Sequence, residues 1–287
     1  MSLLTLGVNH DSAPIQIREQ LAISDETLPQ ALHSLLQLAP ISEAAIVSTC
    51  NRIEIYCSVE SSAAGKELLS QWLSDFKQLA LEQIQPYLYA YSDEAVAKHL
   101  FRVGSGLDSM VLGEPQILGQ LKQAYTKAAN AETLGKDLNQ LFQQCFNVAK
   151  KVRTHTAIGA NPVSVASTAV SLAKQIFADL GDQRALFIGA GETIELAAQH
   201  MYANGTTDIT IANRSLQKAQ TLAKLYQGQA IELTDIHSAL PHSDIVITAT
   251  ASQLPILGKG LLEQSLKQRK HKPILVLDLA IPRDVEP

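Results

Sequence analysis

The chain has 287 residues, 46% of them hydrophobic, and a formal net charge of −5. Single cores tend to split at about 250 to 300 residues, so this length predicts two domains. The acidic balance excludes a broad electrostatic surface for nucleic acid and leaves only local contacts. Apolar runs stop short of the roughly 18 to 20 residues that span a bilayer, and no secretory signal is present at the N-terminus. We therefore expect a cytoplasmic protein without membrane contact.

The cysteines, at positions 50, 57 and 145, form neither an even disulfide framework nor a metal-ligand spacing. We expect free thiols in a reducing compartment and no metal site.

The N-terminal part mixes strands and helices. Residues 3–9, 43–48 and 52–59 read as strands, and residues 25–39 read as a helix with Ser24 as its N-cap. Because the order is strand, helix, strand, strand, the sheet is predicted to be antiparallel or mixed. Within 52–59, alternating Ile53, Ile55 and Cys57 predict a half-buried strand.

From Ser92 onward the pattern becomes helical. Ser92, with Glu94 nearby, resembles a capping box, and a long helix is expected after Pro115, a residue suited to the first helical turn. A further helix is predicted through 136–156.

The pattern breaks at Gly159, Asn161 and Pro162, so we place the domain boundary between residues 158 and 159. Beyond it, apolar strands alternate regularly with helices, which predicts a doubly wound parallel sheet. The predicted fold class is α/β: an N-terminal α+β domain, 1–158, with a mixed or antiparallel sheet, and a Rossmann-like doubly wound domain, 159–287.

The segment RALFIGAGETIELAA places Gly189 and Gly191 where a strand gives way to a helix. Such a turn lets the backbone approach a pyrophosphate resting on the helix N-terminus. The third fingerprint position is Ile194 rather than Gly or Ala, and a tight turn without ligand is the alternative. Given the α/β context, we predict a dinucleotide site formed by Gly189, Ala190, Gly191, Glu192, Thr193 and Ile194.

The second strand of this domain ends in ITIANRS, where an NAD enzyme usually has Asp or Glu for the ribose 2′-hydroxyl. Here Asn213, Arg214 and Ser215 occupy that position. A guanidinium binds a 2′-phosphate that a carboxylate would repel, so we predict NADPH rather than NADH. The alternative is that Arg214 merely caps the next helix, which Ser215 can do unaided.

Cys50 differs from the other cysteines. Cys57, inside a strand, and Cys145, among apolar residues, are typical buried thiols. Cys50 lies in a polar turn with Thr49, Asn51 and Arg52, a setting predicted to lower its pKa. The residues alone leave a reactive and a structural thiol equally open.

Polar residues also gather in GLDSMVLGEPQILGQ, residues 106–120. Gln116 and Gln120 are four apart and share a helix face, with capping and solvent exposure as the alternative. His99 has helical spacing from Val96 and Val103, which favours a packed histidine.

Together GVNHDSAP, STCNRIEIY, GLDSMVLGEPQILGQ, GAGETIELAA and NRS resemble glutamyl-tRNA reductase, over essentially the whole chain. The resemblance implies that Cys50 attacks the ester joining glutamate to its tRNA. It also implies that NADPH reduces the thioester to glutamate-1-semialdehyde, which enters tetrapyrrole biosynthesis. Thioester formation splits one hard step into two, and the nicotinamide supplies hydride.

The predicted catalytic residues are Cys50 and, by the resemblance, His99. Arg52 is expected to bind the substrate carboxylate with its fork of donors. The predicted substrate-binding set is Thr49, Asn51, Arg52, Ser109, Glu114, Pro115, Gln116 and Gln120.

The resemblance implies glutamyl-tRNA(Glu) as substrate and glutamate-1-semialdehyde aminomutase as partner. The family's longer members form a homodimer through a C-terminal helical region, and this chain stops at IPRDVEP before it. The alternatives are a cysteine-dependent aldehyde dehydrogenase or shikimate-dehydrogenase-like oxidoreductase, and a non-catalytic NADPH-sensing module.

Overall fold

The computed structural model describes residues 2–159 and 164–287. The chain divides into two compact units, Met1–Ser164 and Val165–Pro287, here called the N-terminal and C-terminal units. The boundary expected from the sequence lay between residues 158 and 159. Asn161 and Pro162, on which that expectation rested, lie outside the described residues. The division into a catalytic and a cofactor domain stays a prediction.

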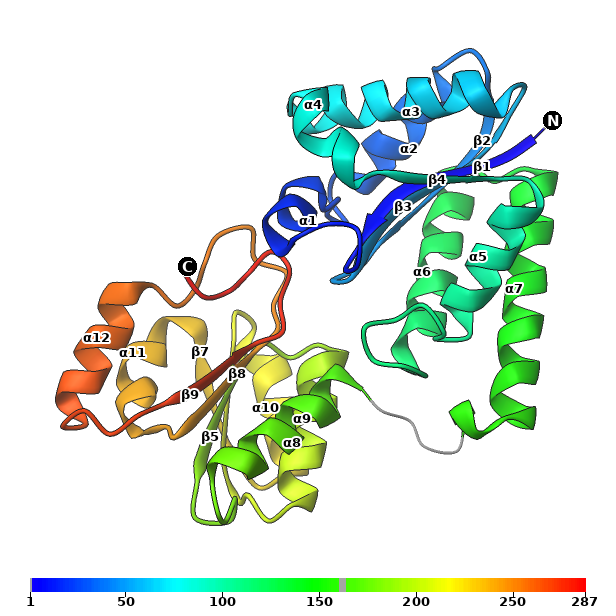
Figure 1. Cartoon of the computed structure of the whole chain (residues 1–287). Coiled ribbons are helices and arrows are strands. Elements are labelled where there is room, and N and C mark those ends of the chain that lie inside the picture. The colour runs from blue at the N-terminus through cyan, green and yellow to red at the C-terminus, as the bar shows by residue number, and fades with distance from the viewer. Residues whose placement is uncertain (1, 160–163) are drawn as a thin grey trace. The chain divides into compact units, whose positions relative to one another are not determined.

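The N-terminal unit is an α+β sandwich. Its described strands form a sheet of order β2-β3-β1-β4, in which every neighbouring pair is antiparallel. Of the two predicted arrangements, antiparallel and mixed, the sheet has the antiparallel one. Helices α2 and α3 cover one face of the sheet, and α5, α6 and α7 lie on the other side (Figure 1). The elements are β1 (Ser2–Asn9), α1 (Ile15–Leu21), α2 (Leu28–Leu36), β2 (Ile41–Ser48), β3 (Arg52–Val59), α3 (Ser62–Lys77), α4 (Leu81–Ile84), β4 (Tyr89–Ser92), α5 (Glu94–Gly104), α6 (Gln116–Asn130) and α7 (Lys136–His155), with short 3-10 turns at Gln85–Tyr87 and Ala157–Gly159.

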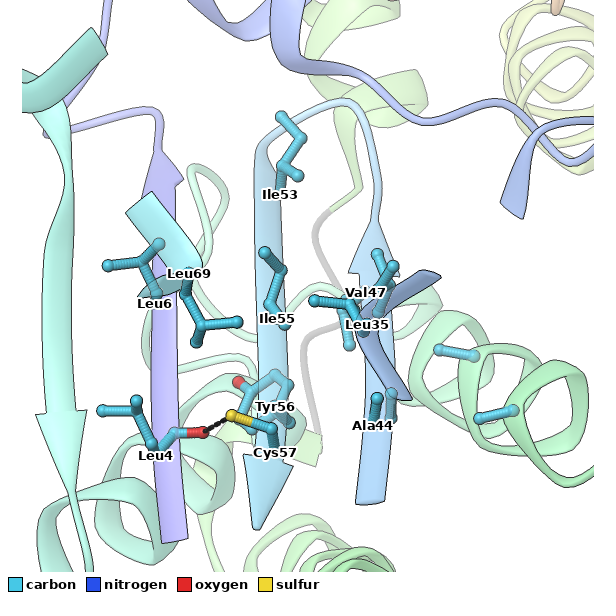
Figure 2. Close-up of a cluster of buried hydrophobic side chains, with 14 of the residues drawn as sticks. Leu4, Leu6, Leu35, Ala44, Val47, Ile53, Ile55, Tyr56, Cys57 and Leu69 are labelled. Atoms are coloured by element: carbon cyan, nitrogen blue, oxygen red, sulfur yellow. Dashed lines mark hydrogen bonds between the residues drawn. The ribbon is translucent and has the colours of Figure 1, made fainter. Parts of the chain in front are cut away.

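Strand β3 is buried on both faces, so the prediction of a half-buried strand was wrong. Ile55 and Cys57 pair with Leu6 and Leu4 of β1, and these side chains pack under Leu69 of α3 (Figure 2). The alternate positions carry polar side chains, and the helices on the other side cover them. The polar side chains that are buried on this second face therefore need hydrogen-bond partners within the fold.

Two predicted helix starts were also wrong. Ser92 ends β4, and α5 begins at Glu94 after Asp93, so Ser92 does not open a capping box. Ser24 stabilises a turn through its contact with Thr27, and α2 begins only at Leu28. The helix expected after Pro115 is confirmed as α6.

The C-terminal unit is a doubly wound α/β domain, as predicted. Its described strands form a parallel sheet of order β7-β6-β5-β8-β9. The strand order reverses at β5, which places the topological switch point between β5 and β8. The elements are α8 (Val165–Ile176), β5 (Arg184–Ile188), α9 (Glu192–Ala203), β6 (Asp208–Asn213), α10 (Leu216–Leu225), β7 (Gln229–Glu232), α11 (Ile236–Ala239), β8 (Ile245–Thr248), α12 (Lys259–Gln268) and β9 (Leu275–Asp278), with 3-10 turns at Leu233–Asp235 and Leu240–His242.

Apolar side chains cover both faces of this sheet. Ala185 and Phe187 of β5 pack with α8, α9 and α10, whereas Leu186 and Ile188 pack toward α11 and α12. Continuous apolar strands are expected for a sheet that is covered on both sides. No helix in the described part of the chain is long and apolar enough to cross a membrane.

Candidate active site

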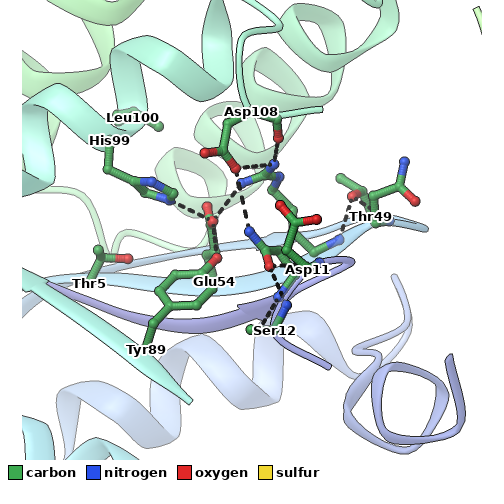
Figure 3. Close-up of polar contacts among 12 residues, drawn as sticks. Thr5, Asp11, Ser12, Thr49, Glu54, Tyr89, His99, Leu100 and Asp108 are labelled. Atoms are coloured by element: carbon green, nitrogen blue, oxygen red, sulfur yellow. Dashed lines mark hydrogen bonds and ion pairs between the residues drawn. The ribbon is translucent and has the colours of Figure 1, made fainter. Parts of the chain in front are cut away.

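A buried ion pair lies on the polar face of β3. Arg52 Nη1 donates to Glu54 Oε1 at 2.8 Å, and the two side chains are 1% and 0% exposed. The hydroxyl of Tyr56 donates to the same carboxylate. The hydroxyl of Tyr89 also donates to it, and His99 Nε2 lies 2.7 Å from Oε1 (Figure 3). His99 is thus part of a polar network, beyond the apolar packing that its helical spacing predicts.

The network fixes the charges of Arg52 and Glu54. Burial alone would raise the pKa of Glu54, but Arg52 and His99, with the Tyr56 hydrogen bond, hold it below its usual range. Burial alone would lower the pKa of Arg52, but the Glu54 carboxylate and the neighbouring groups raise it. Both groups are therefore ionised at neutral pH.

The outer edge of Arg52 contacts a loop. Its Nη2 donates to the backbone oxygen of Asp108 and, at 3.0 Å, to Asp108 Oδ1. Asn9 Nδ2 lies 3.4 Å from the same carboxylate oxygen. Asp108, at 22% side-chain exposure, is more accessible than Glu54. The donor fork predicted to bind a substrate carboxylate is therefore occupied by a carboxylate of the chain itself.

Cys50 lies at the tip of the turn that joins β2 to β3. Thr49 Oγ1 accepts hydrogen bonds from the backbone N–H groups of Asn51 and Arg52, both at 3.2 Å, and closes the turn. Arg18 of α1 donates to the Cys50 carbonyl oxygen at 2.6 Å. These hydrogen bonds hold the turn in place, and Cys50 is half-buried as a residue.

The prediction of a lowered pKa for Cys50 was wrong. Burial of the sulfur and the nearby Glu114 carboxylate raise the pKa of Cys50 to about 11, against the opposing effect of Arg18 and Arg52. The prediction considered only the polar neighbours of Cys50 in the sequence. It missed Glu114, which is far away in the chain but raises the pKa of Cys50 in the folded protein. The thiol therefore needs a change of surroundings before it becomes a good nucleophile.

The predicted residues of the 106–120 segment have different environments. Glu114 and Gln116 are buried, at 6% and 7% exposure. Gln120 lines a cavity of about 190 Å³ together with Ser48. Ser109 and Pro115 are half-buried. The fold thus brings Glu114 into electrostatic contact with Cys50, whereas Gln120 faces a separate cavity beside β2.

In the C-terminal unit, the turn between β5 and α9 has the form that a dinucleotide needs. Gly189 has φ +118°, and a Cβ there would lie 2.5 Å from the oxygen of Ala249, so only glycine fits. At Gly191, which precedes α9, a Cβ would meet open space. Ile194 is fully buried, while Glu192 is exposed at the helix start. The backbone at this helix N-terminus is thus accessible to an anion.

The end of β6 presents a cation. Arg214 is exposed, and Ser215 caps α10 by accepting from the Lys218 N–H. Asn213 Nδ2 donates to the Ser215 oxygen at 3.1 Å and shapes the corner. Because Ser215 provides the cap, Arg214 is not needed for that purpose. These residues and the β5–α9 turn gather at the carboxyl edge of the same sheet.

Comparison with known proteins identifies the family. Residues 6–156 match the model of the glutamyl-tRNAGlu reductase N-terminal domain, and residues 171–287 match that of shikimate / quinate 5-dehydrogenase. Glutamyl-tRNA reductases of Ectopseudomonas mendocina and Pseudomonas putida are each 53% identical over the whole chain, which covers 67% of each relative. The chain belongs to the glutamyl-tRNA reductase family. The resemblance noted in the sequence is confirmed.

A solved glutamyl-tRNA reductase supports the same fold. The enzyme from Methanopyrus kandleri is 32% identical, with a TM-score of 0.53, and the match covers 99% of this chain and 67% of that one. The predicted fold is therefore confirmed in both units. The roles of individual site residues stay predictions.

Sequence reasoning missed several residues around Cys50 and Arg52. These are Arg18, Glu54, Tyr89 and Asp108. A signal for Glu54 was present, since Arg52 and Glu54 share one face of a strand and form an ion pair there. Asp108 lies beside Ser109 in the 106–120 segment but was not singled out. Arg18 and Tyr89 come from distant segments and left no local signal.

Proposed function

We propose that this chain catalyses the NADPH-dependent reduction of glutamyl-tRNA(Glu) to glutamate-1-semialdehyde, the first step of tetrapyrrole biosynthesis. The observation that carries the proposal is the position of Cys50. Cys50 is a half-buried residue at the tip of a hydrogen-bonded turn, where Arg18 contacts its carbonyl oxygen, in a member of the glutamyl-tRNA reductase family.

In the first half-reaction, the Cys50 thiolate attacks the ester carbonyl carbon of the charged tRNA. The C–O bond to the terminal ribose breaks, the tRNA hydroxyl takes a proton, and glutamate remains on sulfur as a thioester. In the second half-reaction, the thioester carbonyl is reduced, the C–S bond breaks and the aldehyde leaves. The ester is already activated, and transfer to sulfur keeps it activated for reduction.

Arg52 and Glu114 are the proposed ligands of the glutamyl group. Arg52 would take the γ-carboxylate, which requires Asp108 to leave its Nη2. Glu114 would take the α-ammonium near the thiol. Placing a positive charge next to Glu114 opposes the effect of this carboxylate on Cys50 and favours the thiolate. His99 is proposed to keep Glu54, and through it Arg52, in place.

The C-terminal unit fits NADPH. The open backbone at Gly191 would hold the pyrophosphate at the start of α9, and Arg214 would bind the 2′-phosphate. When bound, NADPH supplies the hydride for the second half-reaction. Residues 189–194 and 213–215 are the proposed contacts.

Partners and location follow as proposals. Glutamate-1-semialdehyde aminomutase is the proposed consumer of the aldehyde, and a homodimer is proposed for longer members of the family. The free thiols at 50, 57 and 145 support a reducing, cytoplasmic setting.

The shikimate-dehydrogenase-like alternative rests on the match over residues 171–287. It leaves Cys50 and its surroundings without a role, whereas the reductase reading uses both units.

The test measures NADPH consumption by wild type and Cys50→Ser with three substrates: glutamyl-tRNA, 3-dehydroshikimate, and uncharged tRNA mixed with free glutamate. The second is the ketone that a shikimate dehydrogenase reduces with NADPH. The proposal predicts consumption only by the wild type and only with glutamyl-tRNA. Consumption with 3-dehydroshikimate, or undiminished consumption by Cys50→Ser, would contradict it.

A further inference from the structure

Two carboxylates hold the C-terminal segment of the chain against the loop after β8. Asp284 is fully buried, and its Oδ2 accepts from the Thr250 N–H at 2.9 Å while its Oδ1 accepts from the Thr250 hydroxyl. Asp278 Oδ1 accepts from Thr248 Oγ1 at 2.9 Å, and its Oδ2 accepts from the Val285 N–H at 2.9 Å. Every one of these contacts lies within the C-terminal unit.

Backbone hydrogen bonds extend the same attachment. The Asp284 carbonyl oxygen accepts from the N–H groups of Ile256 and Leu257, at 2.7 and 2.9 Å. Leu257 and Val285 form a parallel bridge, and the segment runs beside the loop between β8 and α12 (Figure 1). Thr250 Oγ1 also accepts from the Ser252 N–H at 3.1 Å. Asp284 therefore fixes Thr250 at one end of the loop and Ile256 and Leu257 at the other.

The loop after β8 begins at the edge of the sheet where a dinucleotide would bind. A dinucleotide lies across the carboxyl edge of the sheet at the switch point, which here is between β5 and β8. Arg214 lies after β6, on one side of the Gly189 turn, so the adenosine half belongs there. The nicotinamide half then extends to the other side, over the end of β8. Ala249 contacts Gly189 so closely that a Cβ at Gly189 would lie 2.5 Å from its oxygen.

We propose that Asp284 is a positioning residue for the nicotinamide half of the cofactor. It acts through Thr250, whose backbone and hydroxyl it holds at the end of β8, and it has no contact with the adenosine half. Because the carboxylate is buried and accepts from both donors of Thr250, displacing the start of the loop would leave it without these partners and would cost free energy. The inference rests on the NADPH assignment made above and adds a residue to it.

The test compares two ligands by isothermal titration calorimetry of the 287-residue chain. NADPH contains both halves of the cofactor, whereas adenosine 2′,5′-bisphosphate contains only the half near Arg214. In Asp284→Asn, we expect NADPH affinity to fall about tenfold and adenosine 2′,5′-bisphosphate affinity to stay within about twofold. Thr250→Val removes the hydroxyl and keeps the backbone N–H. It should show the same selectivity with a smaller loss of NADPH affinity, and it serves as the test if Asp284→Asn does not fold.

Asp244→Asn is the matched control. Asp244 is also buried, at 2% exposure, and pairs with Arg269 and Lys272 at the opposite edge of the sheet. A variant that merely loosens the unit should affect both ligands alike. Equal loss of both ligands in Asp284→Asn or Thr250→Val, or unchanged NADPH affinity, would overturn the inference. Failure of wild type to bind either ligand would instead overturn the NADPH assignment itself, and the inference with it.

Discussion

The Arg52 guanidinium joins Glu54 to Asp108, and the two carboxylates are held very differently. Glu54 is on β3, fully buried, with hydrogen bonds from Tyr56 and Tyr89. Asp108 is partly exposed and lies on a loop whose ends meet where the Gly113 N–H donates to the Gly106 oxygen at 2.8 Å. Both glycines have positive φ, +74° at Gly106 and +80° at Gly113. Of the two carboxylates, Asp108 is the one that an incoming carboxylate can displace.

Asp108→Ala should therefore strengthen substrate binding. Removing the side-chain competitor leaves Arg52 paired with Glu54 and with the uncharged backbone oxygen of residue 108. No internal carboxylate then competes with the substrate carboxylate at Nη2, so we expect the KM for glutamyl-tRNA to fall about three- to tenfold. Steady-state kinetics measures this. Asp25→Ala, which removes an exposed ion pair with Lys127, is the control and should leave KM unchanged. A raised KM in Asp108→Ala would show that Asp108 assists binding rather than opposing it.

Glu54→Gln should destabilise the N-terminal unit strongly. The change leaves Arg52 with a weaker partner in a buried position, and breaking a buried pair costs about 3 to 5 kcal/mol. Urea unfolding measures the free energy. Glu60→Gln, at an exposed position just after β3, should unfold like the wild type. A stability equal to the wild type in Glu54→Gln would mean that the network is not a determinant of the fold.

The polar network around Glu54 could be predicted only in part from the sequence. The strand carrying Arg52 and Glu54 was recognised from its apolar alternation, but the partners of Glu54 lie 35 and 45 residues away, at Tyr89 and His99. Strand β4, which carries Tyr89, has only four residues, and two of them are exposed, so it gave no periodic signal. Contacts between distant segments are fixed by the tertiary fold and are not encoded locally.

Cys50 should react slowly at neutral pH and faster as pH rises. With a pKa of about 11, only about one thiol in ten thousand is ionised at pH 7, so the alkylation rate should rise about tenfold per pH unit up to pH 10. Iodoacetamide labelling followed by peptide mass analysis measures the rate at Cys50 separately from Cys57 and Cys145.

Glu114→Gln tests the cause of this raised pKa. Loss of the carboxylate should lower the pKa of Cys50 and accelerate labelling at pH 8. Cys57 and Cys145, whose pKa values burial raises to about 12, are internal controls and should remain unreactive in both proteins. A rate that levels off near pH 8 in the wild type would disprove the raised pKa.

Arg214→Ala should remove the preference for NADPH. The exposed guanidinium at the end of β6 pairs with the 2′-phosphate, so the KM for NADPH should rise about tenfold or more while the KM for NADH stays the same. Lys224→Ala, at the far end of α10, controls for loss of one positive charge. Equal preference for the two cofactors in wild type would defeat the assignment.

The C-terminal unit was easier to predict than the N-terminal unit. Its apolar strands alternate with helices, and the glycines at 189 and 191 mark the turn, so the order of elements and the site followed from local pattern. The attachment of the last residues to the loop after β8 was not predicted. It depends on Asp284 and Thr250, which are 34 residues apart and become neighbours only in the folded unit.

The central claim is that Cys50 accepts the glutamyl group, and intact mass analysis tests it most directly. Wild type and Cys50→Ser are each incubated with glutamyl-tRNA in the absence of NADPH, so that the second half-reaction cannot proceed. The account predicts a glutamyl adduct on the wild type and none on Cys50→Ser. An adduct of equal yield on both proteins, or loss of the ester at the same rate in both, would contradict it.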